Sequence, residues 1–223
     1  MMLQLQQTVV LPMPLLRLDA LRRASVTTEP FQFTVIRDFL APTDAAAVRA
    51  DFPEIPYPGL LPVEAMQSGP LFRTLIDELK SEAFSQTLSE KFDLDLVGRP
   101  MMLTVRGRCA ARDGRIHTDS ETKLASALLY LNDPWEAFGG RLRLLRGPDD
   151  LNDMVAEVSP DAGTLVAFRR SDRSFHGHEP YVGVRRYVMI NWMTSGPAAR
   201  REILRHHISA RTKRLFSTAT RHA

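Results

Sequence analysis

The stretch "KLASALLYLNDPWEAFGGRLRLLR", residues 123–146, has a segment of strand-forming residues on each side of a turn that contains proline and glycine. Further segments of this kind between residues 99 and 194 are "RPMMLTVRG", "DMVAEVS", "GTLVAFRR" and "RRYVMINWMT". Many short strands after a helical N-terminal half predict a mostly β fold with flanking helices (α+β). The sequence therefore indicates a β-sandwich or jelly roll backed by helices.

The N-terminal half supplies the expected helices. "FQFTVIRDFL" (31–40) alternates apolar and polar residues and predicts a strand, and "PTDAAAVRADF" (42–52) predicts a helix capped by Thr43. Residues 54–69 form a proline-rich loop in this interpretation. Residues 70–92 carry apolar side chains near helical spacing, so we expect one long helix there.

Composition indicates the class of protein. Of the 223 residues, 44% are hydrophobic and 25% are charged, which is ordinary for a soluble globular protein, and no apolar run approaches the length of a membrane span. The single cysteine, Cys109, favours a reducing compartment, and we expect a cytoplasmic protein. We expect one domain over 1–223, with an arm at 1–25, a strand and supporting helices at 26–98, a jelly-roll core at 99–195 and a basic helical tail at 196–223.

The two ends of the chain leave alternatives open. Residues 1–25 lack an early positive cluster and contain Pro12 and Pro14, so we interpret them as an ordered arm or edge strand and not as a targeting peptide. Such an arm could reach a partner subunit in a homodimer. The stretch 199–223 has seven Lys and Arg against one Glu. It fits a basic amphipathic helix lying on the domain, or a contact to nucleic acid or an acidic partner.

The stretch "GRIHTDSETK" (114–123) places His117 and Asp119 two residues apart, so on a strand both side chains leave the same face. Further along, "RSDRSFHGHEPYVGVRRYVMINW" adds His176 and His178. If one of these returns to the first pair, two histidines and a carboxylate form the facial triad of non-haem Fe(II) oxygenases. This arrangement leaves adjacent coordination positions open for a chelating co-substrate and O2. The alternative is that these are ordinary surface or core histidines.

The final predicted strand contains Arg186, whose position predicts a bound anion. Arg186 shares an apolar face with Val188 and Trp192, and a guanidinium directed into an apolar interior is costly unless a carboxylate meets it. A bound dicarboxylate would meet it through a charge-assisted fork. By the same alternation, Arg185 would face solvent. Tyr130 could donate its hydroxyl to the same carboxylate, or it could be a core tyrosine with another partner.

Three segments together resemble the 2-oxoglutarate- and Fe(II)-dependent dioxygenases of the prolyl-hydroxylase type. They are "HTD", "SALLYLNDPWEAFGGRLRLL" and "GTLVAFRRSDRSFHGHEPYVGVRRYVMINW", over roughly residues 99–195. The resemblance implies a double-stranded β-helix, the jelly-roll or cupin-like core. It also implies Fe(2+), 2-oxoglutarate and O2, with ascorbate as a candidate reductant. The implied reaction hydroxylates an unactivated C–H bond and releases succinate and CO2.

The resemblance also implies roles for individual residues. The iron ligands would be His117, Asp119 and His176, and the contacts to 2-oxoglutarate would be Arg186 for its far carboxylate and Tyr130 as a supporting hydroxyl. The ten residues from His176 to Arg186 fit the family interval, whereas His178 would leave eight. An aspartate at position 119, in place of glycine or alanine, implies hydroxylation instead of halogenation.

The substrate stays open at this level. It could be a small metabolite, a sugar, an amino acid or a residue of a peptide or protein, and hydroxylation of an N-methyl group would lead to demethylation. Prolyl hydroxylases tend to carry an aromatic residue where this chain has Thr104, Val105 and Arg106. The basic loop 106–115 could favour an acidic substrate or simply be solvated. The alternative functions are a non-catalytic cupin-like metal-binding sensor or structural module, and a nucleic-acid-associated protein.

Overall fold

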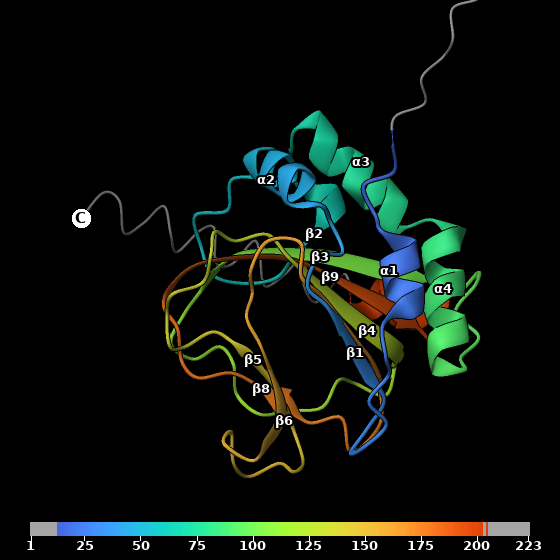
Figure 1. The fold of residues 1–223 in the computed structure, drawn as a ribbon, viewed down its shortest axis with the longest axis vertical. Coiled ribbons are helices and arrows are strands. Elements are labelled where there is room, and N and C mark those ends of the chain that lie inside the picture. Colours follow the sequence, from blue (N-terminus) through green and yellow to red (C-terminus); the bar gives the residue numbers. More distant parts are fainter. Residues whose placement is uncertain (1–12, 203, 205–223) are drawn as a thin grey trace, which may run out of the picture.

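The computed structural model describes residues 13–202 and 204, which form two antiparallel sheets with helices on one side (Figure 1). The larger sheet has the strand order β1 (Phe33–Ile36), β7 (Leu165–Arg169), β4 (Lys123–Tyr130), β9 (Gly183–Met193), β3 (Met101–Cys109) and β2 (Leu61–Pro62). The smaller sheet has the order β6 (Met154–Val158), β5 (Leu142–Leu145) and β8 (His176–Gly177). The predicted α+β jelly roll is confirmed.

The helices cover the outer face of the larger sheet (Figure 1). They are α1 (Leu18–Arg23), α2 (Pro42–Ala50), α3 (Pro70–Leu79) and α4 (Glu82–Phe92), with a single 3-10 turn, η1, at Val63–Ala65. Side chains of α3 and α4, such as Leu75 and Phe84, pack in one cluster with Val188, Ile190 and Trp192 of β9. This helix-covered layer is the main hydrophobic core of the described residues.

The structure divides the predicted helix 70–92 into α3 and α4. Ser81 is the N-cap of α4, and its hydroxyl accepts a hydrogen bond from the backbone N of Phe84 at 3.3 Å. A serine that caps a helix satisfies a backbone donor that would otherwise lack a partner, so a new helix begins there. The predicted cap at Thr43 is wrong, because α2 is capped by Ala41 without a side-chain hydrogen bond.

The described part of the predicted arm contains the short helix α1 and packs on the core. Leu15 and Leu16 donate their backbone N–H groups to the carboxylate of Glu78 at 3.0 and 2.9 Å, and α1 follows directly. An edge strand is therefore not what residues 13–25 form. The remainder of the arm, residues 1–12, lies outside the described residues, so its proposed contact with a partner subunit stays a prediction.

Both faces of the larger sheet are covered by other parts of the protein. One face meets the helices through Val188 and Trp192. The opposite face, with Tyr187 and Phe168, belongs to a second cluster that also contains Leu144 of the smaller sheet. Because apolar residues line both faces, an apolar pattern along β9 does not tell which face looks into the space between the sheets.

The last described residues form a helix at 196–202. Ala198 and Ala199 pack there against Met102 and Met193. The rest of the predicted tail, residue 203 and residues 205–223, lies outside the described residues. Among the residues that are described, no helix has the length and apolar character needed to cross a bilayer.

We predict that Phe84→Ala will destabilise the protein strongly. Phe84 is fully buried, and its ring lies 5.8 Å from that of Phe39 and 5.6 Å from that of Trp192, measured between centroids. Deleting a buried phenylalanine ring costs about 3–5 kcal/mol of unfolding free energy. Urea denaturation measures this change. Phe138→Ala is the matched control, because Phe138 is 79% exposed, and equal unfolding midpoints for the two variants would contradict the assignment of the core.

Candidate metal centre

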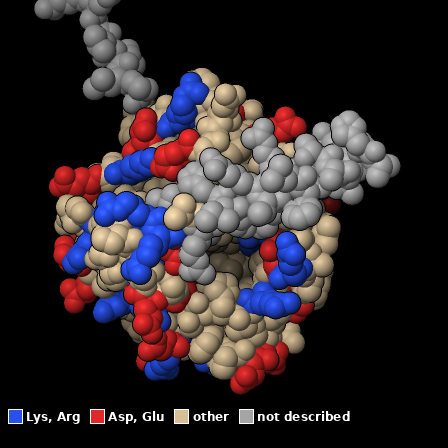
Figure 2. Space-filling model, turned by 180° about the vertical axis from the view of Figure 1, so that it is seen from behind, with Lys and Arg blue, Asp and Glu red and all other residues tan. Residues whose placement is uncertain are grey.

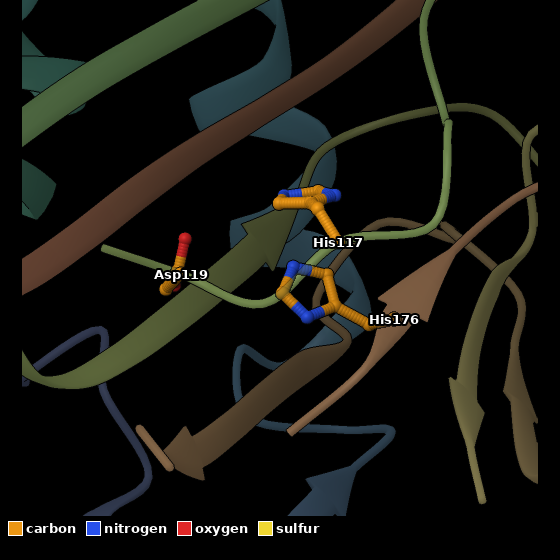
Figure 3. A group of neighbouring side chains, drawn as sticks. All are labelled: His117, Asp119 and His176. Atoms are coloured by element: carbon orange, nitrogen blue, oxygen red, sulfur yellow. The ribbon is translucent and has the colours of Figure 1, made fainter. Parts of the chain in front are cut away.

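The three predicted ligands lie together at one end of the space between the sheets. His117 and Asp119 belong to the segment between β3 and β4, and His176 begins β8. One ligand atom from each side chain lies within 4.8 Å of the others. Figure 3 shows the two imidazoles side by side, with the carboxylate of Asp119 next to them. The structure therefore brings the two parts of the predicted triad to one point.

A short backbone bridge joins the two segments. The backbone N of His117 donates to the carbonyl of His176 at 3.0 Å, and the reverse hydrogen bond has the same length. This single antiparallel pair lies outside the named strands, so the expected regular strand around residue 117 is reduced to one bridge. The bridge still holds the two rings close, with their centroids 4.3 Å apart.

Backbone carbonyls fix the orientation of both imidazoles. Nδ1 of His117 lies 2.9 Å from the carbonyl O of Arg115, and Nδ1 of His176 lies 3.0 Å from that of Ser174. A carbonyl only accepts, so each Nδ1 carries the proton and each Nε2 keeps a free lone pair. Burial, and then the neighbouring His117, lowers the pKa of His176 to about 4. The His176 ring is therefore neutral near pH 7, as a metal ligand must be.

Asp119 is held by side chains that the sequence did not reveal. Lys123 Nζ donates to Oδ1 at 2.8 Å, and the hydroxyl of Ser126 donates to Oδ2. Asn191 on the neighbouring strand β9 donates in turn to the Ser126 hydroxyl at 2.8 Å. Burial alone would raise the pKa of Asp119, but the positive charge of Lys123 leads a set of contacts that lower it to about 2. The carboxylate is thus ionised and fixed in direction.

This donor set fits a divalent transition metal. Two imidazoles, each with its Nδ1 held by a backbone carbonyl, and one ionised carboxylate are the ligand types of a mononuclear non-haem iron site. The carbonyl and hydroxyl partners behind them are the outer contacts that normally orient such ligands. The residues present therefore fit Fe(2+).

A cavity of about 140 Å³ adjoins the three ligands. Its walls are partly apolar, and four of their side chains are Leu128, Leu142, Phe168 and Met189. Polar and charged groups in the same lining include Arg106, Asp113, His178 and Arg185. The cavity therefore combines a metal site, an apolar wall and two guanidinium groups.

Arg185 is the most deeply buried cation of this cavity. The residue is 2% exposed, its Nε donates to the carbonyl O of Gly140 at 2.7 Å, and its Nη2 donates to the Tyr130 hydroxyl at 3.4 Å. Its guanidinium carbon lies 5.3 and 5.1 Å from the ring centroids of Tyr130 and Tyr187. Burial opposes the charge, but these tyrosines raise the pKa of Arg185. No carboxylate among the described residues forms an ion pair with it.

The prediction that Arg186 points into the interior, with Arg185 toward solvent, is wrong. Arg186 is half-buried on the other face of β9 and lines a separate surface cleft with Arg49 and Arg108. Arg186 and Val188 do lie on one face, as the alternation predicts, but that face packs against the helices and the cavity lies on the other face of β9.

Tyr130 and His178 are not among the metal ligands, and both have other hydrogen-bond partners. Tyr130 is completely buried, and burial raises its pKa to about 12, so its hydroxyl stays protonated beside Arg185. His178 lines the cavity but turns its Nδ1 to the carbonyl O of Glu179 at 2.8 Å. It is not part of the group formed by the three ligands.

An antiparallel two-sheet fold that holds two histidines and an aspartate beside a cavity defines a mononuclear metal site of the non-haem type. Residues 108–194 match the model of the 2OG-Fe(II) oxygenase superfamily. This match, the fold and the three ligands together support an enzyme of the 2-oxoglutarate-dependent dioxygenase class. The family implies Fe(2+), 2-oxoglutarate and O2.

Solved structures with the same fold include prolyl hydroxylases. A prolyl-4-hydroxylase from Pseudomonas putida is 20% identical at a TM-score of 0.50, with 82% of this chain and 93% of that chain covered. A prolyl 4-hydroxylase from Phytophthora capsici is 20% identical at a TM-score of 0.51, with 74% of this chain and 59% of that chain covered. No curated protein matches the sequence. At these identities the likeness shows the fold.

We predict that the protein binds one divalent metal ion per chain and that His117→Ala or His176→Ala abolishes this binding. The ligands have one arrangement in the folded protein, so the metal stabilises the fold by about 2.7 kcal/mol at a concentration 100 times its Kd. Mn(II) titration by calorimetry, with the thermal midpoint as a second measurement, tests this. His178→Ala is the control and should keep the site. Equal Mn(II) binding by the wild type and the His176→Ala variant would contradict the assignment.

Proposed function

We propose that the protein is a hydroxylase that uses Fe(2+), 2-oxoglutarate and O2 to hydroxylate an unactivated C–H bond. The co-products would be succinate and CO2. The proposed iron ligands are His117, Asp119 and His176. The proposed anchor for the far carboxylate of 2-oxoglutarate is Arg185, which replaces Arg186 in the set expected from the sequence. Tyr130 supports Arg185 through its hydroxyl.

The observation that carries this proposal is the unpaired charge of Arg185. A buried guanidinium without an anion is expensive, because few of its lost contacts with water are replaced. Its Nε and Nη2 have acceptors in Gly140 and Tyr130, but no described residue bonds to Nη1. A carboxylate entering the cavity would satisfy this group by a charge-assisted hydrogen bond. A dicarboxylate with a keto acid at its other end would meet the metal ligands in the same cavity.

Each group of the chain has a separate task in the proposed reaction. Bound iron would supply the site where the keto acid and O2 react. His117 and His176 present Nε2 because their Nδ1–H groups bond to backbone carbonyls, and Lys123 and Ser126 hold the Asp119 carboxylate. Arg185 and Tyr130 would orient the co-substrate, and the apolar side chains of the cavity wall would exclude water. The exclusion of water strengthens every charge interaction in the cavity.

A non-catalytic cupin-like metal-binding module is the alternative that the structure makes less attractive. Such a module needs the three ligands but has no use for an unpaired arginine buried in the same cavity. The nucleic-acid hypothesis depends on the basic tail, most of which lies outside the described residues. On the face seen in Figure 2, Lys and Arg side chains of the described residues are interspersed with Asp and Glu side chains.

The class of substrate follows only in part from the relatives. Two solved structures of this fold are named prolyl 4-hydroxylases, so a peptide or a small molecule containing proline is one candidate.

The single cysteine, Cys109, is buried, and a reducing compartment suits a ferrous ion, so we propose the cytoplasm as the location. Ascorbate as reductant, the homodimer and the single domain over 1–223 stay predictions.

We predict that the protein with Fe(II) slowly converts 2-oxoglutarate to succinate without added substrate, and that Arg185→Met raises the 2-oxoglutarate KM tenfold or more. Loss of a charge-assisted pair costs on the order of 2 kcal/mol, and each 1.4 kcal/mol corresponds to about tenfold in affinity. Succinate formation measured against 2-oxoglutarate concentration tests this. Arg186→Met, a change of the same type one residue away, should leave KM within about twofold. A larger effect of Arg186→Met would refute our choice of anchor.

A further inference from the structure

We infer that the substrate is a small monocarboxylic acid and that Arg106 binds its carboxylate. This inference rests on the proposed function, because it assigns the part of the cavity that 2-oxoglutarate would leave free. Arg106 lies on β3 and lines the same cavity as the three metal ligands. Its side chain is only 12% exposed, so it is a wall of the cavity and not part of a solvated basic loop.

The cavity wall fixes the position of the Arg106 guanidinium. In the pairing of β3 with β9, Arg106 lies opposite Tyr187, and its guanidinium carbon is 5.9 Å from the centroid of the Tyr187 ring. Tyr187 also contacts Arg185, at 5.1 Å by the same measure. The two arginines therefore share one aromatic neighbour and one cavity, while each has its own set of hydrogen-bond partners.

Among the described residues, Asp113 forms the one ion pair of Arg106, and the Nε atom of Arg106 is left without a partner. Its carboxylate forms an ion pair with Nη1 of Arg106 and accepts the backbone N–H of Ala110 at 2.9 Å, so the loop holds it in place. The Nε atom of Arg106 is buried and has no hydrogen-bond partner. A buried donor without an acceptor is costly, and the side of a guanidinium that carries Nε matches a carboxylate in a two-point contact. Arg106 therefore keeps an edge to which an acid can bind.

The charges of the site favour an anion with a single charge. Three cations, Arg106, Lys123 and Arg185, face two carboxylates, Asp113 and Asp119, which leaves one positive charge when the histidines are neutral. Iron in the ferrous state and doubly charged 2-oxoglutarate cancel each other. One carboxylate on the substrate then neutralises the loaded site, whereas a phosphate monoester or a dicarboxylate would leave an excess of negative charge.

The two arginines are suited to different carboxylates. Arg185 has no acidic partner among the described residues, so it is the stronger anchor and takes the co-substrate. Arg106 is already paired with Asp113, so its affinity for an acid is moderate, as suits a substrate that must leave as product. The apolar side chains of Leu142 and Phe168 in the cavity wall favour an acid with an aliphatic or aromatic body.

A panel of acids and their primary amides tests this inference. Aliphatic and aromatic monocarboxylic acids, each paired with its amide, are titrated by calorimetry into the Mn(II)-loaded protein with 2-oxoglutarate bound. Succinate formation with Fe(II) is followed for the same compounds. At least one acid should bind ten times more tightly than its amide and should stimulate succinate formation. Phosphate monoesters and dicarboxylates form a second arm and should bind more weakly than the best monocarboxylate.

Substitutions of Arg106 and Arg108, both on β3, test whether Arg106 is the residue that binds the acid. Arg106→Gln should weaken binding of the best acid tenfold or more and leave its amide and 2-oxoglutarate within about twofold. Arg106→Lys should restore part of the acid affinity. Arg108→Gln is the matched control, since Arg108 lies on the same strand but lines the separate surface cleft, and it should change nothing.

The outcomes separate this inference from the proposed function. Acids that bind no better than their amides overturn the inference, as do tighter binding of phosphate monoesters or dicarboxylates and an Arg106→Gln variant with unchanged acid affinity. Loss of 2-oxoglutarate binding in that variant would instead make Arg106 the anchor of the co-substrate. If Arg106→Gln fails to fold, the comparison of acids with amides on the wild type still decides. Failure of the proposed function would appear as an absence of succinate formation in the wild type without substrate.

Discussion

The backbone bridge between His117 and His176 is the interaction on which the site depends. Its two hydrogen bonds of 3.0 Å join the segment before β4 to the start of β8. The bridge therefore holds the two imidazoles together, and the Nδ1 of each is bonded to a backbone carbonyl, which leaves Nε2 for a metal. Asp119 completes the group from the same segment as His117. Ligands arranged by backbone contacts in this way are pre-organised for a metal ion.

Two arginine side chains line the cavity beside this bridge. Arg185 and Arg106 both line it, and each is only partly satisfied by the described protein groups. Charged groups buried in this way are retained in enzymes because they bind and orient charged reactants in a site with little water. In the proposed reaction, the two arginines would hold two acids in one cavity, Arg185 the co-substrate and Arg106 the molecule to be hydroxylated.

Much of the fold and the triad could be predicted from the sequence, because both depend on local patterns. The strands follow from runs of β-forming residues, and the ligands from the close spacing of His117 and Asp119. Arg185 could not be identified in the same way, because β9 is covered on both faces and its apolar pattern fits either one. The hydrogen bonds from Ser126 and Asn191 depend on the pairing of β4 with β9, which only the structure reveals.

The most direct test of the account is a crystal structure of the protein grown without oxygen, with Mn(II) and N-oxalylglycine, an unreactive analogue of 2-oxoglutarate. The account predicts an anomalous peak for Mn(II) between His117, Asp119 and His176, with the far carboxylate of the analogue hydrogen-bonded to Arg185. A metal ion at another place, or an analogue whose carboxylate contacts Arg186 in the outer cleft, would contradict it.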